Sequence, residues 1–391
     1  MANKIQVMIE SNSYNLVTGY SRVVREIMFR LAKDEKYEVF HIGQQYSGMP
    51  VMNNGVTIFP LIDSGKSLRQ YWVDRVKPDY YLWIEDSFTM TAQEGLNLNL
   101  YDGKLVLYIP HDGENCPTTG IPMMKRADKI VAMTDFGKEV MEKDGFNVDA
   151  VIYHGVDTDI YKPASKIQKL KIKSKFKFNS DDRIILYIAR NSPRKLPQLN
   201  IDIVAKFLIK HPKAKYLIHM PDFTNPSTDL VDYIQRCLPI QFGNEYKDLL
   251  SKQIFFSPLC NSLNLGAQDS EIAQLYQVAD IYATFASGEG FGFPLIEAAA
   301  TEVPVVATDY TTTHELTVAP KCGLASKPIS TWASAFNVRH AIPDVEASVK
   351  DLEKVYCNQK LAEDMGSNGR AFVKDKCDWD KIAEQWKEVF K

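Results

Sequence analysis

The sequence lacks several features that would assign a protein to a class at once. It has six cysteines in 391 residues, but no CxxC pair and no Cys/His spacing that suits zinc. No window approaches 18 consecutive apolar residues, and the N-terminus has no long apolar core. We therefore expect neither a membrane-spanning helix nor a secretion signal. These absences predict a cytoplasmic protein whose cysteines are buried thiols.

An excess of charge of one sign is missing as well. The formal net charge is −3, whereas a protein that binds nucleic acid generally presents a basic face. We therefore expect no nucleic-acid partner. Two questions stay open: a weak peripheral association with the cytoplasmic membrane face through a local basic patch, and the oligomeric state. The first strand-to-helix turn carries no GxGxxG motif, which disfavours a dinucleotide cofactor.

Short apolar runs alternate with amphipathic runs along most of the chain, a pattern that predicts parallel βαβ units. The expected strands are 4–9, 38–42, 79–84, 104–109, 129–133 and 149–153, then 183–189, 214–220, 252–256, 280–285 and 303–308. The expected helices include 20–33, 134–145, 196–211, 269–279, 293–301 and 378–390. Two such runs predict an α/β fold with two Rossmann-like, doubly wound domains.

The length of the chain is typical of two domains. We expect an N-terminal domain at 1–163, joined by 375–391, and a C-terminal domain at 164–374. The lysine run at 166–177 is interpreted as a solvated linker face. The final helix spaces Trp379, Ile382, Trp386 and Phe390 at intervals of three and four, which predicts one apolar face.

The end of the strand at 280–285 carries the most unusual stretch, ASGEGFGFPLIEAA. Glycines let backbone amides approach a ligand, and a proline suits the first turn of a helix. Amides near 290–293 are therefore expected to point outward from a helix N-terminus and to form an anion site. Glu289 and Glu297 flank that site. A phosphate esterified to two hydroxyl-rich groups explains both carboxylates; the alternative is a glycine-rich turn with solvated glutamates.

The strand at 183–189 ends in ARNSPRK, which supplies cations at the same kind of strand end. Arg190 and Lys195 suit a diphosphate, because arginine offers a planar fork and lysine a point charge. Plain surface charge is the alternative. Arg194 is a weaker candidate and is expected to be solvated.

The first half of the chain offers two further candidates. Gly19 precedes a helix and could let a ligand lie against the backbone. His111 follows the strand at 104–109, where ligands gather in open parallel sheets; a purely structural histidine is the alternative.

Two acidic patterns are interpreted as structural. Asp157 and Asp159 form a DxD sequence, but no acidic or histidine cluster lies beside it in sequence, so we expect no metal site there. Asp378 and Asp380 begin the final helix, where capping and the helix dipole explain aspartate.

The motif EGFGFPLIE resembles the E-x7-E signature of the retaining glycosyltransferases of family 4, which have the two-domain GT-B fold with a central cleft. The segments HGVDTDIY, ADIYATFAS, ARNSPRK and VPVVATD also match. There are departures. The family usually shows two glycines where this chain has TTTHEL (311–316), which puts the role of Glu315 in doubt. Leucine follows Lys195 where glycine is usual, and the N-terminal loop has one glycine instead of a pair.

The resemblance implies a role for each candidate residue. The donor diphosphate would be bound by Arg190, Lys195, Gly19, Gly290, Phe291 and Gly292. The donor sugar would contact Glu289, His111 and Phe293, with Glu289 and His111 as the catalytic pair, and Glu297 would bind the ribose. It also implies that no cofactor or essential metal is needed, and that the C-terminal helix crosses back to the N-terminal domain.

The expected reaction moves a sugar from a UDP- or GDP-linked donor to a hydroxyl of a glycan, lipid or protein-glycan acceptor with retention of configuration. By resemblance this hexosyltransferase would use same-face attack assisted by the leaving phosphate. Two alternatives stay open. One is a GT-B nucleotide-sugar epimerase or phosphorylase, and the other is a non-catalytic protein that binds nucleotide sugars.

Overall fold

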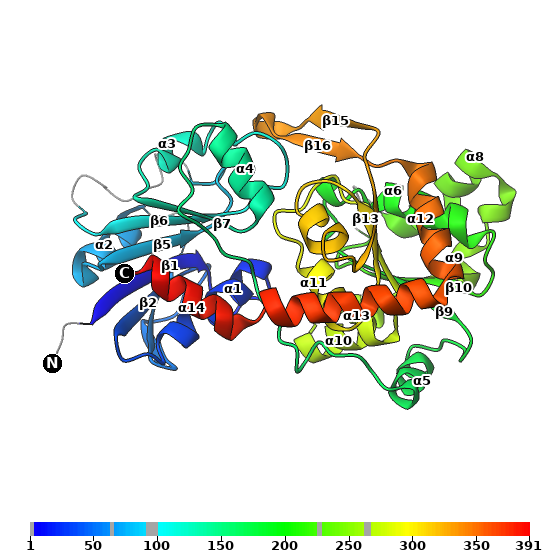
Figure 1. Ribbon diagram of the computed structural model, residues 1–391, viewed down its shortest axis with the longest axis horizontal. Coiled ribbons are helices and arrows are strands. Elements are labelled where there is room, and N and C mark those ends of the chain that lie inside the picture. The colour runs from blue at the N-terminus through cyan, green and yellow to red at the C-terminus, as the bar shows by residue number, and fades with distance from the viewer. Residues whose placement is uncertain (1–3, 63–65, 91–100, 225–228, 262–266) are drawn as a thin grey trace. The chain divides into compact units, whose positions relative to one another are not determined.

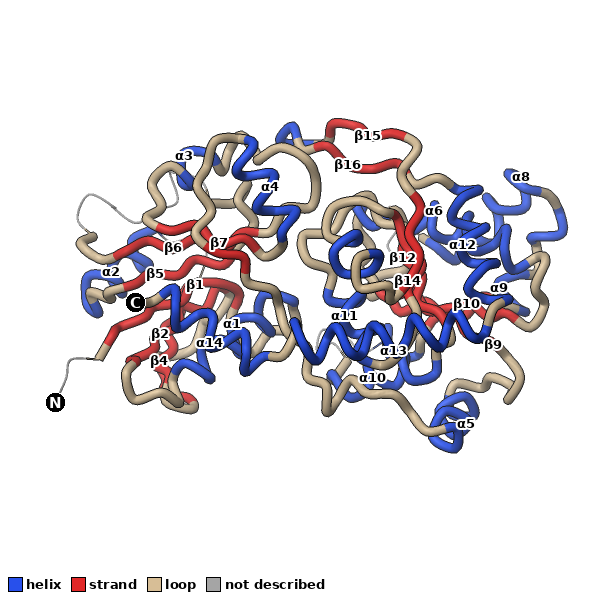
Figure 2. Tube along the Cα trace, viewed as in Figure 1, coloured by secondary structure: helices blue, strands red, loops and turns tan. Residues whose placement is uncertain are grey.

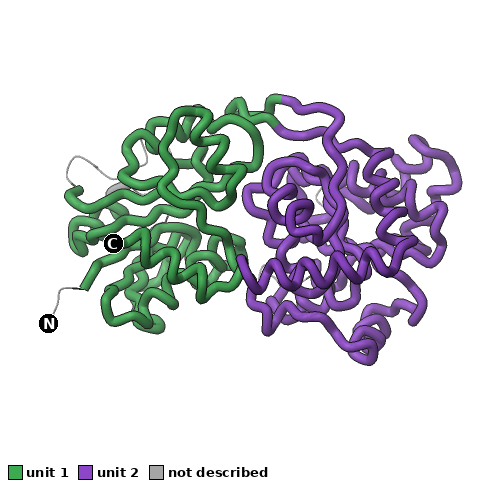
Figure 3. The backbone as a smooth tube through the Cα atoms, in the orientation of Figure 1, with its two compact units in different colours: residues 1–155, 333–339, 377–391 green, residues 156–332, 340–376 purple. Residues whose placement is uncertain are grey.

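The computed structural model describes residues 4–62, 66–90, 101–224, 229–261 and 267–391. The chain divides into two compact units (Figure 3). Unit 1 consists of Met1–Gly155, Ala333–Arg339 and Cys377–Lys391, and unit 2 of Val156–Trp332 and His340–Lys376. The domain division at 163/164 stays a prediction.

Unit 1 is built on a sheet of strand order β3-β4-β2-β1-β5-β6-β7-β8, in which the described neighbours are parallel except for β3 and β4. The strands are β1 (Ile5–Asn12), β2 (Tyr37–Gln44), β3 (Val51–Asn53), β4 (Val56–Leu61), β5 (Tyr80–Ile84), β6 (Lys104–Ile109), β7 (Lys129–Ala132) and β8 (Ala150–Val151). The helices are α1 (Gly19–Leu31), α2 (Lys66–Val76), α3 (Ile121–Met124), α4 (Asp135–Lys143) and α14 (Trp379–Val389).

The central strands of unit 1 are apolar on both faces because helices cover both sides of the sheet (Figure 2). In β6, every residue after Lys104 is buried. The helices begin where the sequence supplies caps: the side chain of Thr18 accepts the Ser21 amide at α1, and that of Thr134 accepts the Gly137 amide at α4.

Unit 2 has a fully parallel sheet of order β11-β10-β9-β12-β13-β14 within the described residues. The strands are β9 (Arg183–Ile188), β10 (Ala214–His219), β11 (Ile254–Phe256), β12 (Ile281–Thr284), β13 (Val305–Thr308) and β14 (Gly323–Ser326). The helices are α5 (Lys166–Lys175), α6 (Pro197–Leu208), α7 (Leu230–Asp232), α8 (Leu238–Phe242), α9 (Leu249–Lys252), α10 (Asp269–Val278), α11 (Phe293–Ala300), α12 (Val345–Cys357) and α13 (Gln359–Lys376).

Helices cover both faces of this second sheet as well. Helix α6 packs with α12 on one face, and α11 packs with α13 on the other (Figure 1). A separate pair of strands, β15 (Ser330–Ala333) and β16 (Arg339–Ile342), follows β14 in the chain.

The lysine run at 166–177 differs from the sequence-based interpretation. Residues Lys166–Lys175 form α5, whose first turn is closed by a capping box between Ser165 and Gln168. Lys173 is buried and donates to the carbonyls of Ser180 and Asp182, while Lys169 pairs with Asp280 at 2.8 Å. The expectation of a solvated linker face holds for most of these lysines, which are exposed, but it is wrong for Lys169 and Lys173, whose ammonium groups fasten the helix to unit 2.

The final helix, α14, buries the apolar face that its spacing predicts. Trp379, Ile382, Trp386 and Phe390 are all at most 4% exposed, and α14 packs against α1 within unit 1. Its N-cap, Asp378, accepts hydrogen bonds from the amides of Asp380 and Lys381. The capping role expected for Asp378 is thus confirmed.

Candidate active site

The cations and the glycine-rich loop of unit 2 follow two neighbouring strands, β9 and β12. The chain runs from β9 outward to β10 and β11 and then returns to place β12 on the other side of β9. This is a topological switch point, and in open parallel sheets ligands bind at such points beside the carboxyl ends of the strands. The fold therefore brings together residues about a hundred positions apart in sequence.

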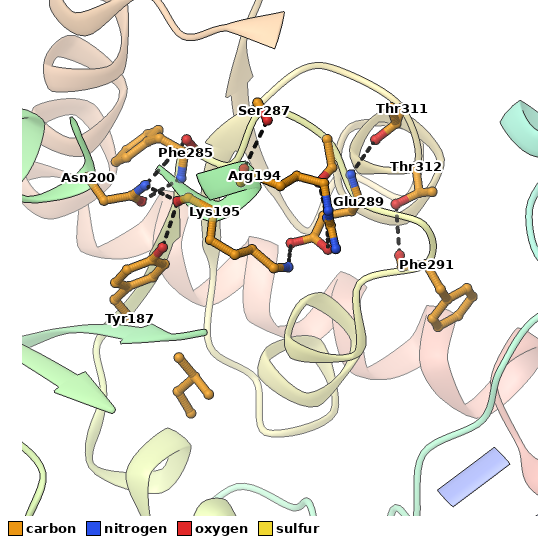
Figure 4. Close-up of polar contacts among 12 residues, drawn as sticks. Tyr187, Arg194, Lys195, Asn200, Phe285, Ser287, Glu289, Phe291, Thr311 and Thr312 are labelled. Carbon is orange, nitrogen blue, oxygen red and sulfur yellow. Dashed lines mark hydrogen bonds and ion pairs between the residues drawn. The ribbon is translucent and has the colours of Figure 1, made fainter. Parts of the chain in front are cut away.

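The Glu289 carboxylate lies against two cations of the loop after β9 (Figure 4). Lys195 forms an ion pair with Oε1 of Glu289, and Nη1 of Arg194 lies 3.3 Å from Oε2. The Arg194 guanidinium also donates to the Gly288 carbonyl. Arg194 was expected to be solvated; that expectation is wrong, since its side chain is only 30% exposed and bridges the two loops.

The charge of Glu289 is set by two opposing effects. The residue is 7% exposed, and burial acts to raise the pKa of its carboxyl. Lys195 and Arg194 outweigh burial and hold the pKa below its ordinary value. Glu289 is therefore an ionised carboxylate in a site largely closed to water.

Two hydrogen bonds fix the main chain at Lys195, and a third links one of their donors to the end of β12. Its carbonyl accepts from the phenol of Tyr187 at 2.8 Å and from Nδ2 of Asn200 at 2.9 Å. Asn200 is fully buried, and its Oδ1 accepts the amide of Phe285 at 2.7 Å. A single amide side chain thus ties the start of α6 to the end of β12 (Figure 4).

Residues 285–292, called the glycine loop below, connect β12 to α11. Gly292 is the N-cap residue and has φ of +94°, a conformation that glycine adopts without strain. A Cβ there would also lie 2.8 Å from the Leu295 side chain. Among the described residues, no backbone hydrogen bond engages the amides of Gly290 or Gly292. The loop can therefore offer these two donors at a helix N-terminus.

A third loop, which follows β13, forms two hydrogen bonds with the glycine loop. The Glu289 amide donates to Oγ1 of Thr311 at 2.9 Å, and Oγ1 of Thr312 donates to the Phe291 carbonyl at 2.7 Å. These threonines stand in the TTTHEL segment, where the resemblance would place glycines. Side-chain hydroxyls here bind the loop that carries Glu289.

Glu297 and Phe293 lie on α11. Glu297 is 4% exposed, and its Oε2 accepts a hydrogen bond from the buried phenol of Tyr276 at 2.8 Å. A carboxylate has about four lone-pair sites, and Tyr276 occupies one of them. Phe293 is half-buried and packs edge to face on Phe291, with ring centroids 5.7 Å apart. The roles in binding ribose and sugar stay predictions.

Arg190 differs from the two other cations of its loop. It is exposed, and no hydrogen bond or ion pair of its side chain occurs within the described parts of the chain. It stands immediately beyond the end of β9, so it remains available to a ligand at the switch point.

His111 and Gly19 belong to unit 1 and are described with it. His111 is 3% exposed, and burial lowers its pKa to about 4 against the opposing charges of Asp112 and Asp144. Its Nε2 lies 3.4 Å from Sγ of Cys116, and its Nδ1 has no partner among the described residues. The imidazole is therefore neutral near pH 7. Gly19 is exposed and is the first residue of α1.

The DxD sequence performs a local structural task. The Asp157 carboxylate accepts from the amides of Asp159 and Ile160, at 2.9 and 3.1 Å, and so closes a turn. No group of three or more potential metal-ligating His, Cys, Asp or Glu residues occurs in the part of the chain that the structure describes. Nor does any described helix combine the length and apolar character needed to cross a bilayer.

The residues that support the candidate site could not be identified from the sequence. Asn200, Thr311, Thr312 and Tyr276 carry no motif that sets them apart. The signal for Arg194 was its place beside Lys195, but its partner lies 95 positions later.

Known proteins resemble this chain in sequence and in fold. The model of the family described as "Glycosyl transferases group 1" matches residues 168–372. A D-inositol 3-phosphate glycosyltransferase of Streptomyces bingchenggensis is 25% identical over 68% of this chain and 52% of its own length. The chain spans about half the length of the curated relatives it matches.

Two solved structures share the fold over nearly the whole chain. Sucrose-phosphate synthase from Thermosynechococcus elongatus superposes with a TM-score of 0.75 at 14% identity, covering 99% of this chain and 98% of that one. HepE of Anabaena, solved in complex with UDP-glucose, gives 0.72 at 16% identity and 98% coverage of both chains. The two parallel α/β sheets are those of the GT-B fold. Because the family match spans more than half of its residues, the chain belongs to the glycosyl transferases group 1 family.

Proposed function

We propose that this protein is a retaining glycosyltransferase that moves a hexosyl group from a nucleoside diphosphate sugar to an acceptor hydroxyl. The observation that carries the proposal is the ion pair of Lys195 with Glu289 at the switch point between β9 and β12, with Arg190 in the same loop as Lys195. Cations and free loop amides suit the diphosphate, and an ionised carboxylate beside them suits sugar hydroxyls.

The reaction needs negative charge to be stabilised on the leaving diphosphate. Arg190, Lys195 and the amides of Gly290 and Gly292 would supply that stabilisation from fixed positions. We assign Glu289 to holding the sugar and not to forming a glycosyl-enzyme, because Arg194 holds its carboxylate to the neighbouring loop. Retention would then follow from same-face attack, with the leaving phosphate taking the acceptor proton.

The donor is proposed to be UDP- or GDP-linked, and UDP-glucose is the first candidate because HepE of Anabaena was solved with it. The acceptor class is proposed to be a glycan, lipid or protein-glycan hydroxyl. The cytoplasmic location and weak peripheral membrane association remain predictions.

A thermal-shift panel of UDP-, GDP- and ADP-sugars tests the donor, followed by turnover of the sugar that stabilises the protein most. Glu289→Gln is expected to lower turnover by about a hundredfold or more. If no nucleotide sugar raises the melting temperature, or if Glu289→Gln retains full turnover, the proposal fails. Product analysis separates transfer from epimerisation, and a trapped covalent glycosyl-enzyme would contradict same-face attack.

A further inference from the structure

Arg194 is fastened to the glycine loop by both its main chain and its side chain. Its carbonyl accepts hydrogen bonds from the amide and from Oγ of Ser287, each at 2.9 Å. Its guanidinium donates to the Gly288 carbonyl and lies 3.3 Å from the Glu289 carboxylate. These contacts connect two ligand-binding loops without using Lys195 (Figure 4).

Once a donor is bound, the ammonium group of Lys195 can no longer pair with Glu289 exclusively. Its ammonium group is a point charge with three donors on a flexible stem. A diphosphate carries more negative charge than a carboxylate, so the donor would draw the ammonium toward itself. Glu289 would then lose part of the charge that compensates its burial.

Among the described groups that face Glu289, Arg194 is the cation that can take over from Lys195 as its partner. Besides Lys195 and Arg194, its charge acts on the buried phenols of Tyr187 and Tyr282, whose pKa values are raised by burial and then by Glu289. Those phenols donate elsewhere, Tyr187 to the Lys195 carbonyl and Tyr282 to the Ile188 carbonyl. Among these described neighbours, Arg194 is the cation whose position does not depend on the ligand.

We propose that Arg194 is a positioning residue that holds Glu289 in place and ionised while the donor diphosphate engages Lys195. The planar guanidinium suits this task because it reaches the Gly288 carbonyl and the carboxylate together. The inference rests on the proposed function, since it assigns Lys195 to the diphosphate. It predicts that Arg194 affects the chemical step and its pH dependence more than donor affinity.

The test compares Arg194→Gln and Arg194→Lys with a matched control, Arg190→Gln, in the same loop. For Arg194→Gln we expect kcat to fall about tenfold to a hundredfold, with KM changed less than about threefold. The acid limb of the kcat profile should move to higher pH, because Glu289 loses a cation. Arg194→Lys should recover part of kcat and bring the acid limb back toward wild type. Arg190→Gln should raise KM, lower kcat because a cation on the leaving diphosphate is lost, and leave the acid limb in place.

Calorimetry with free UDP and GDP gives a readout that does not depend on turnover. The nucleoside diphosphate lacks the sugar, so its affinity should be equal in wild type and Arg194→Gln within about threefold, but weaker in Arg190→Gln. An unmoved acid limb, or a loss confined to KM, would overturn the role of Arg194 while leaving the transferase proposal standing. A wild-type protein that binds neither nucleotide would overturn both. If Arg194→Gln does not fold, the kcat, KM and pH profile of Arg194→Lys decide.

Discussion

The amide of Glu289 donates to the hydroxyl of Thr311 over 2.9 Å, and Thr311 makes this contact from a backbone with φ of +54°. A β-branched residue is strained in the left-handed region. Thr311 is 6% exposed, so surrounding packing holds it there. The loop after β13 thus accepts backbone strain at the residue that fixes the main chain of the carboxylate.

Two substitutions of Thr311 separate that strain from the hydrogen bond. Thr311→Val keeps the shape and the strain but loses the bond, so we expect a loss of about 1–2 kcal/mol in the free energy of unfolding. Thr311→Gly relieves the strain by about 1 kcal/mol while losing the same bond, and should be nearly neutral. Both should lower kcat about tenfold. Thr308→Val is the control, because the buried Thr308 hydroxyl has no partner among the described residues.

Removing the charge of Glu289 should change stability in a pH-dependent way. Its pKa is lowered in the folded state, so the ionised form contributes stability above the unfolded pKa, and this contribution is lost as pH falls through the folded pKa. We expect Glu289→Gln to lose about 1–3 kcal/mol at pH 7 and progressively less below pH about 4. Urea unfolding at both pH values measures this. Glu346→Gln, in the exposed pair with Lys206, should change little; a loss that is constant with pH would contradict the prediction.

Gly155 leaves no room for a side chain beside the C-terminal helix. A Cβ at this position would lie 2.5 Å from the ring of Trp379 within unit 1. Gly155→Ala should therefore reduce the free energy of unfolding by about 1–3 kcal/mol through overpacking. Adding Trp379→Phe, which shortens the ring, should recover part of the loss. A double variant less stable than the sum of the two single changes would show that the ring is not the obstacle.

Four of the seven histidines are buried in a neutral form. Burial lowers the pKa from 6.5 to about 4 in His41, His111 and His219 and to about 3 in His154. The unfolded chain binds more protons than the folded one between these values and 6.5, so stability should fall as pH drops through that window. Each group contributes up to about 1.4 kcal/mol per pH unit. Chemical denaturation from pH 7 to 5 measures how steeply the free energy of unfolding changes with pH. His41→Asn should reduce that slope by the contribution of one proton.

The transferase reaction should proceed without a divalent metal. Lys195, Arg190 and the loop amides would carry the charge stabilisation that a metal supplies in other enzymes. Turnover with the donor identified by thermal shift should stay within about twofold after EDTA treatment. A loss restored by Mg²⁺ or Mn²⁺ would contradict this expectation.

Much of the fold follows from the sequence because the central strands of unit 2 are buried runs of apolar residues. The strand expected at 280–285 is β12, and the helix expected at 293–301 is α11. Strands β3, β4, β14, β15 and β16 were not expected. Strands β3, β14, β15 and β16 are short and little of them is buried, so they lack the buried apolar run that marks β12.

Within the candidate site, only the residues proposed to contact the ligand could be named from the sequence. Glycine and proline beside Glu289 are local signals, and so is a cation pair after a strand. The supports depend on contacts between distant loops, as when Asn200 binds Phe285 or Arg194 reaches Glu289. Neither residue has a local pattern that reveals its partner, so tertiary structure alone identifies them.

The burial of α14 in unit 1 has a consequence for synthesis on the ribosome. Phe390 is fully buried, and the Tyr80 phenol donates to the Lys391 carbonyl at 2.7 Å. The sheet of unit 1 emerges from the exit tunnel long before the helix that completes its surface, while unit 2 is translated between them. An apolar face of unit 1 therefore stays uncovered until α14 has been synthesised. During that time the nascent chain is open to chaperone binding and to aggregation.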